Sequence, residues 1–167
     1  FVLPEKQPTI IKVVGVGGGG GNAVNHMFNE GIRDVSYLIC NTDQQVLFTS
    51  PIPDKLQLGP ETTHGLGAGN KPAVAKQAAE ESEEDIRRAL GDSTKMVFIT
   101  AGMGGGTGTG AAPVIAKISR SMDILTVGIV TIPFSWEGAV KINQAMDGVD
   151  AISKEVDALL VINNDLL

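Results

Sequence analysis

Two glycine-rich segments contain the residues best suited to bind an anion. The first reads GVGGGGGN over residues 15–22, and the second reads AGMGGGTGTG over residues 101–110. Glycine lets an anion approach main-chain N–H groups without meeting a Cβ, and it tolerates the left-handed backbone of tight turns. Thr107 and Thr109 add hydroxyl donors to the second segment. Both segments therefore predict loops that bind phosphate.

Each glycine segment lies between a predicted strand and a predicted helix. Residues 10–16 and 96–100, which precede the two segments, are short apolar runs typical of strands buried on both faces. The residues that follow share one helical face: Ala23, Val24 and Met27 in the first case, and Val114, Ile115 and Ile118 in the second. Free N–H groups and the positive end of the dipole make a helix start a good anion site. A single G-x-G-x-x-G is weak evidence, and this context strengthens it.

The rest of the chain continues the alternation of strands and helices. Further strands are predicted over residues 35–40, 124–131 and 158–162, with a short edge strand over 55–58. Helical spacing recurs at Val74, Ala78, Ser82, Ile86 and Leu90, and again at Val140, Ala145, Val149 and Ile152. Residues 62–72 are predicted to form an exposed loop, which ends where Pro72 begins a helix.

This alternation predicts a Rossmann-like α/β fold with three layers, in which a doubly wound, mostly parallel sheet lies between helices. If the two glycine loops follow adjacent strands, they face each other where the strand order reverses, which is where open α/β sheets bind ligands.

Composition excludes several other classes of protein. The 167 residues are 43% hydrophobic, which suits one domain with its own core. The net charge of −6, with no cluster among the 13 Lys and Arg residues, argues against nucleic-acid binding. No apolar stretch approaches the roughly 20 residues of a membrane span, and the N-terminus shows no signal pattern, so we expect a cytoplasmic protein without membrane insertion. Cys40 is expected to be buried, and His26 and His64 lack metal-ligand spacing.

Neither glycine segment contains the lysine of a P-loop. The charge of a bound phosphate chain must therefore be balanced by main-chain amides, helix dipoles and a cation, for which Mg²⁺ is the chemically expected choice.

Motifs along essentially the whole chain resemble those of the tubulin/FtsZ superfamily. The segment GGGTGTG is highly specific to that superfamily, and its combination with GVGGGGGN resembles the FtsZ branch more than tubulin. The matching segments are residues 15–22, 41–43, 65–69, 101–113, 133–134, 137–138 and 164–165.

The resemblance implies a site for GTP or GDP with Mg²⁺, and it identifies no metal ligand. The resemblance implies that Asn41 and Asp43 lie near the phosphates and the cation, and that Ala68 and Gly69 sense the γ-phosphate. It also implies that Glu137 binds the ribose and that Asn164 lies near the nucleoside. The two glycine loops contribute Gly18, Gly19, Gly20, Gly21, Asn22, Gly104, Gly105, Gly106, Thr107 and Gly108. Lys141 stands where the family usually has Arg, so a bidentate contact there becomes a point-charge contact.

The resemblance also implies a biological role. It suggests a GTPase that polymerises head to tail with itself at the division site in the bacterial cytoplasm, with membrane-tethering and other division proteins as partners. Residues 1–167 would be its GTP-binding domain, without the central helix and C-terminal domain. Catalytic acidic residues would come from the next subunit and none from this chain, so we expect binding with poor hydrolysis.

Two alternatives remain open at this point. An NAD-binding oxidoreductase module would use Gly15, Gly17 and Gly20 with the acidic Asp43, although a dinucleotide fold needs only one such loop. The other alternative is a structural polymer subunit that has lost nucleotide binding.

Overall fold

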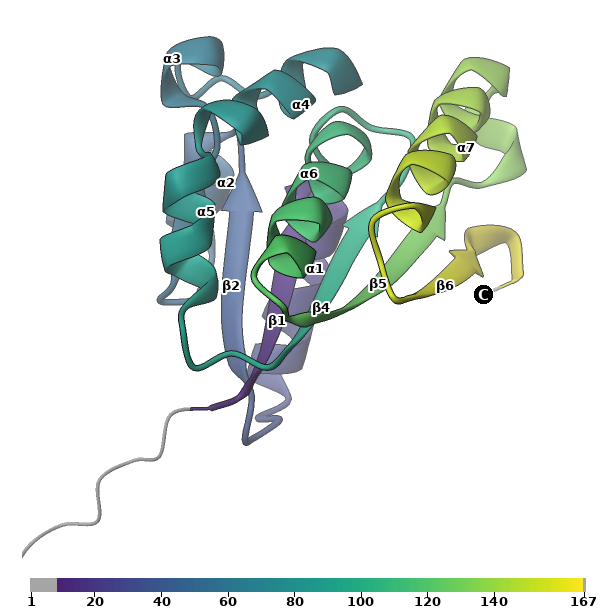
Figure 1. Cartoon of the computed structure of the whole chain (residues 1–167). Helices are drawn as coiled ribbons and strands as arrows, with labels where there is room; N and C mark the ends of the chain where they lie inside the picture. The colour runs from purple at the N-terminus through teal and green to yellow at the C-terminus, as the bar shows by residue number, and fades with distance from the viewer. Residues whose placement is uncertain (1–8, 167) are drawn as a thin grey trace, which may run out of the picture.

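A six-stranded parallel sheet forms the centre of the molecule (Figure 1). A computed structural model describes residues 9–166; residues 1–8, where a signal pattern was sought, and Leu167 lie outside the described residues. The strand order is β3-β2-β1-β4-β5-β6, the Rossmann order, and every pairing is parallel. The strands are β1 (Ile11–Val16), β2 (Ser36–Asn41), β3 (Lys55–Gln57), β4 (Met96–Gly102), β5 (Leu125–Ile132) and β6 (Ala158–Asn163).

Helices cover both faces of this sheet and complete the three predicted layers. Side chains that alternate along β1 enter different cores: Val13 packs in a cluster with Val24, and Val14 in a cluster with Ile115. Figure 1 shows helices both in front of the sheet and behind it. In front lie α4 (Pro72–Glu81), α5 (Glu83–Leu90), α6 (Thr107–Ser121) and α7 (Ala139–Ser153); behind lie α1 (Gly17–Asn29) and α2 (Gln44–Thr49). The short α3 (Pro60–Thr63) and the 3-10 turns η1 (Ser135–Glu137) and η2 (Asn164–Leu166) complete the chain.

Strand β1 lies at the point where the order reverses. Val16 at its end is paired with Cys40 of β2 on one side and with Ala101 of β4 on the other. The segments that follow these strands therefore lie side by side at the carboxyl ends of the strands, as the sequence predicted.

The helical pattern expected from Val74 to Leu90 is interrupted at Ser82. This residue leaves the helical backbone with φ −97° and ψ 19°, and α4 ends and α5 begins around it. Its buried hydroxyl accepts a hydrogen bond from the N–H of Gly59 at 2.9 Å. Every fourth residue is still buried across the break, since Ala78, Ser82 and Ile86 are all buried.

Two local expectations were wrong. The predicted loop over residues 62–72 is not wholly exposed, because Thr63 ends α3 and is buried, as is Ala68, although α4 does begin at Pro72. Strand β6 is not buried on both faces: Leu160 is 54% and Val161 41% exposed. The reason is that β6 is an edge strand, which pairs with β5 alone.

Cys40 is buried as expected, and burial raises the pKa of its thiol to about 12. Between residues 9 and 166, no helix combines the length and apolar character needed to cross a membrane.

Candidate functional site

The two glycine loops touch each other at the carboxyl ends of β1 and β4. A Cβ added at Gly17, where φ is +76°, would lie 3.0 Å from the amide nitrogen of Gly108. A Cβ at Gly19 would lie 3.5 Å from the Cα of Gly102. The two backbones thus approach each other so closely that a side chain at Gly17 would press against Gly108.

Helix α1 begins inside the first glycine segment, at Gly17, and α6 begins inside the second, at Thr107, and neither helix has a side-chain cap. Val16 precedes α1 and Gly106 precedes α6, and neither position supplies a side-chain acceptor for the first N–H groups. Ser, Thr, Asp and Asn are the residues preferred for satisfying these groups, and among the α-helices of residues 9–166 only α2 has such a cap, from Asp43. Two sets of free donors, each at the positive end of a helix dipole, therefore converge on one place.

A cavity of about 570 Å³, here called the loop cavity, lies between these helix starts. Its size is in the range of small-molecule sites. The predicted site residues that line it are Gly18, Gly19, Asn41, Asp43, Ala68, Gly69, Gly105, Gly106, Thr107, Gly108, Glu137, Lys141 and Asn164.

Four predicted residues do not line the loop cavity: Gly20, Gly21, Asn22 and Gly104. Gly20 allows α1 to pack on β4, since a Cβ there would lie 2.2 Å from the carbonyl oxygen of Thr100. Gly21 is buried, and Asn22 is exposed on α1. Gly104 turns with φ +108° beneath Lys141.

The sequence reasoning missed Thr42, which lies fully buried between two predicted residues. Its hydroxyl oxygen lies 2.8 Å from that of Thr107, so the loop after β2 is hydrogen-bonded to the second glycine loop. Thr131 and Pro133 were missed as well. One signal was available for all three, because each lies at or just beyond the end of a predicted strand, where the site of such a sheet forms.

Asn41, the last residue of β2, and Asp43 organise the start of α2. The amide oxygen of Asn41 accepts a hydrogen bond from the N–H of Asp43 at 3.1 Å. Asp43 in turn caps α2, since its Oδ1 accepts from the N–H groups of Gln45 at 2.9 Å and Val46 at 3.3 Å. Both bonds use the same carboxylate oxygen, and within residues 9–166 no protein donor is bonded to Oδ2.

Glu137 and Lys141 form an ion pair at the rim of the cavity. The ammonium of Lys141 donates to Oε1 of Glu137 at 3.0 Å, and the N–H of Phe134 donates to Oε2 at 2.7 Å. The hydrogen bond from Lys141 is the main reason why the pKa of Glu137 is lowered. Among the described residues that line the cavity, Lys141 is the one ammonium and is already paired, so an anionic ligand depends chiefly on main-chain donors.

The oxygen atoms that line the loop cavity suit a cation that takes most of its ligands from phosphate and water. Within residues 9–166, no group of three or more His, Cys, Asp or Glu side chains is placed to hold a metal. Asn41, Thr42, Asp43 and Thr107 nevertheless bring oxygen atoms to the loop cavity. Mg²⁺ commonly takes one or two carboxylates and completes its shell with phosphate oxygens and water, so these residues fit it.

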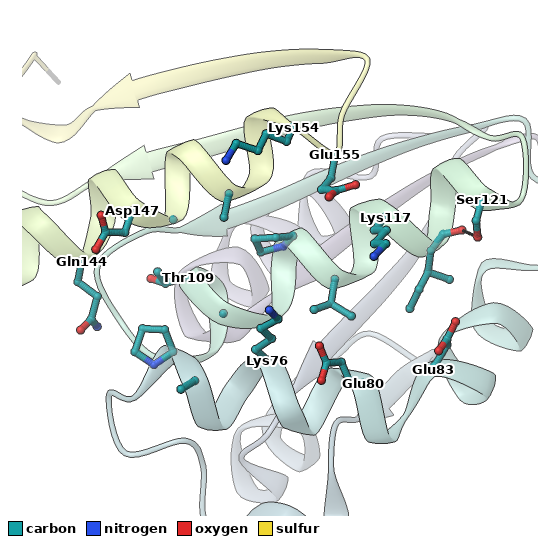
Figure 2. A pocket seen from close by; sticks show the side chains of 18 of the residues that line it. Lys76, Glu80, Glu83, Thr109, Lys117, Ser121, Gln144, Asp147, Lys154 and Glu155 are labelled. Carbon is teal, nitrogen blue, oxygen red and sulfur yellow. Dashed lines mark hydrogen bonds between the residues drawn. The ribbon is translucent and has the colours of Figure 1, made fainter.

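A larger hollow of about 1140 Å³, here called the helix groove, lies among α4, α5, α6 and α7 (Figure 2). Side chains of opposite charge line it, among them Lys76, Glu80, Lys117, Asp147 and Lys154. The two glycine segments, which open α1 and α6, lie at the loop cavity instead, so we assign the candidate site there.

The fold and the loop cavity together define a doubly wound α/β domain in which two glycine-rich segments face one cavity. A family model described as Tubulin/FtsZ family, GTPase domain, matches residues 10–167. The chain belongs to the Tubulin/FtsZ family.

Individual relatives agree with this membership. The chain is 65% identical over 161 residues to the cell division protein FtsZ of Porphyromonas gingivalis (strain ATCC BAA-308 / W83), and the match covers 96% of the chain and 35% of that relative. An FtsZ dimer of M. jannaschii superposes with a TM-score of 0.91 and 43% identity over 96% of this chain and 47% of that one. A GTPγS-bound protofilament of CetZ2 from Haloferax volcanii gives 0.84 and 27%, over 93% and 49%. The chain thus spans about a third to a half of the length of these relatives.

Proposed function

We propose that the loop cavity binds GTP and GDP by their phosphates, and that the chain is the nucleotide-binding part of a GTP-hydrolysing subunit of a bacterial division polymer. The observation that carries the proposal is the close approach of Gly17 to the amide of Gly108, which leaves no room for a side chain and brings two helix starts to one cavity. The relative from P. gingivalis is named a cell division protein, and the CetZ2 structure is described as a GTPγS-bound protofilament.

Phosphate binding in this proposal depends on many weak donors. A helix start contributes about 0.3–1 kcal/mol at an exposed site, so amides from both loops must act together. The N–H groups near Gly18 and Gly19 meet the phosphates from α1, and those near Gly106, Thr107 and Gly108 meet them from α6. Mg²⁺ would neutralise part of the phosphate charge, with Asp43 as its available carboxylate.

Hydrolysis in this proposal is completed between subunits. Phosphoryl transfer needs positioning and charge stabilisation rather than covalent chemistry from the protein. This chain binds and orients the nucleotide, and acidic residues of the next subunit in a head-to-tail polymer orient the attacking water. We therefore expect the isolated chain to bind GTP with little turnover, and phosphate release at the rate of a full-length filament-forming relative would contradict this.

The partners and location follow the same proposal. The polymer assembles from copies of the chain at the division site in the cytoplasm, where membrane-tethering and other division proteins attach to the full-length protein. The net charge of −6 favours neither nucleic acid nor an anionic membrane surface as a direct partner.

Thermal unfolding with matched ligands tests the proposal. A ligand at 100 times its Kd stabilises the folded state by about 2.7 kcal/mol, which corresponds to roughly 5–10 °C in Tm for a domain of this size. GDP and GTP with Mg²⁺ should produce this shift, whereas ADP and NAD at equal concentration should produce much less.

The same titration separates the rival functions. Preferential stabilisation by NAD would favour an oxidoreductase module, which the family match does not support. Absence of any shift with GDP and GTP would favour a polymer subunit that has lost nucleotide binding, and it would contradict the proposal.

A further inference from the structure

Gln144 of α7 makes three hydrogen bonds to the loops of the candidate site, although it does not line the loop cavity. Its side-chain nitrogen Nε2 donates to the carbonyl oxygens of Gly104 at 2.9 Å, Gly105 at 3.1 Å and Asn70 at 3.2 Å. Gly104 and Gly105 belong to the second glycine loop, and Asn70 lies just before α4. One amide group therefore joins the second glycine loop to the segment that contains Ala68 and Gly69.

Other bonds fix the beginning of the second glycine loop. The N–H of Met103 donates to the carbonyl of Thr131 at 2.8 Å, and the N–H of Gly104 donates to the hydroxyl of Thr109 at 2.9 Å. In the part of the chain that the structure describes, the next two N–H groups, of Gly105 and Gly106, have no protein acceptor. These two residues line the loop cavity.

Peptide planarity relates the bonded carbonyls to the free N–H groups. In a trans peptide the C=O of one residue and the N–H of the next point in opposite directions. Gln144 holds the carbonyls of Gly104 and Gly105 from the side of the helix groove, where it lies at one end beside Thr109 and Asp147 (Figure 2). The N–H groups of Gly105 and Gly106 therefore point the other way, toward the loop cavity.

We infer that Gln144 is a positioning residue, which holds the amides of Gly105 and Gly106 in the direction of a bound phosphate. The same side chain fixes residues 68–70 beside them through the carbonyl of Asn70. This inference rests on the proposed function, because it assumes that the loop cavity receives the phosphates of a nucleotide. It assigns a role to a residue that no glycine motif contains.

Substitution of Gln144 tests the inference with two variants. Gln144→Leu keeps most of the volume and removes the donors, and Gln144→Glu keeps the shape and places a carboxylate against three carbonyls. Both should weaken GDP binding about tenfold or more, which is the scale expected when one or two hydrogen bonds that order the loop are lost. Asn143→Leu is the matched control, because Asn143 is an exposed amide on the same helix and lines the helix groove alone. Its GDP affinity should stay within about twofold of the starting protein.

Two readouts distinguish positioning from general support of the fold. Binding of guanosine, which has no phosphates, should change less than twofold in the Gln144 variants while GDP binding falls. In amide NMR spectra, the signals of Gly105 and Gly106 should shift when GDP is added to the starting protein and should shift little in the variants.

The outcomes separate this inference from the proposed function. Failure of the starting protein to bind GDP would overturn the proposed function. Normal GDP binding by both variants, equal losses for GDP and guanosine, or loss of folding in both variants would overturn the inference alone.

Discussion

The side-chain hydroxyls of Thr42 and Thr107 lie 2.8 Å apart, although 65 residues separate them in the chain. Thr42 follows β2 and Thr107 begins α6, so this bond links two of the loops that surround the loop cavity. Thr42 is fully buried, which makes an unpaired hydroxyl there costly.

A double-mutant cycle on this pair should show strong coupling. Thr42→Val and Thr107→Val each leave one hydroxyl without its partner, so each should lower the free energy of unfolding by about 1–3 kcal/mol. The double variant leaves neither hydroxyl and should lose less than the sum. Urea unfolding of the four proteins measures the coupling, and strictly additive losses would contradict a functional bond between the two loops.

Glycines of the first loop should divide into those needed for packing and those needed for binding. Gly20→Ala places a methyl group 2.2 Å from the carbonyl of Thr100, so it should reduce stability by about 1–3 kcal/mol. Gly18→Ala meets open space within 4 Å and should change stability by less than about 0.5 kcal/mol. Its methyl group would nevertheless stand in the loop cavity and lower the affinity for GDP. Urea unfolding and GDP titration of both variants check this, and unimpaired GDP binding by Gly18→Ala would be the contrary result.

Lys141 should contribute to binding more than to stability. The side chain of Lys141 in its pair with Glu137 is 45% exposed, so Lys141→Met should cost less than about 1 kcal/mol of stability. The affinity for GTP should fall, and the loss should shrink as salt is raised because screening weakens an exposed charge. Lys117→Met is the matched control, since Lys117 is an exposed lysine that lines the helix groove instead. Equal effects of both variants on GTP binding would contradict a specific role for Lys141.

Cys40 should resist alkylation until the chain unfolds. Burial raises the pKa of its thiol to about 12, so at pH 8 the folded protein contains almost no reactive thiolate. A raised pKa also means that the thiol's contribution to stability is complete below about pH 9, the value for an unfolded cysteine, and is lost as the pH rises toward about 12.

The rate of reaction with iodoacetamide at pH 8, with and without urea, measures this protection. Cys40 is the one cysteine of the sequence, so the signal has a single source. A native rate close to the rate in urea would contradict the burial seen in the structure.

The sequence predicted the parts of the fold that depend on local pattern. Apolar runs located the buried strands, and the two glycine segments located the helix starts at the carboxyl ends of β1 and β4, because burial and backbone freedom follow directly from residue type. The interruption at Ser82 was not predicted; the buried hydroxyl at the break bonds the N–H of Gly59, a partner distant in sequence that the helical spacing does not reveal. The exposure of Leu160 and Val161 was missed because an apolar run does not reveal whether its strand lies at the edge or the centre of a sheet.

In the candidate site too, the sequence predicted what depends on local pattern and missed what depends on distant contacts. Residues inside a glycine motif could be named, but the motif alone could not separate Gly18, which lines the loop cavity, from Gly20, which packs on β4. Thr42 and Gln144 were missed because their roles depend on partners 39 to 74 residues away. Such roles become visible only when the contacting atoms are located.

The contact between Gly17 and Gly108 also constrains how relatives of this chain can change over time. A side chain at Gly17 would push against the backbone of the second loop, so its acceptance requires a compensating movement at a distant position in the sequence. Divergence at the two loops should therefore proceed by paired replacements rather than by independent ones. Libraries that randomise one loop at a time should yield few functional members, and libraries that vary both together should yield more.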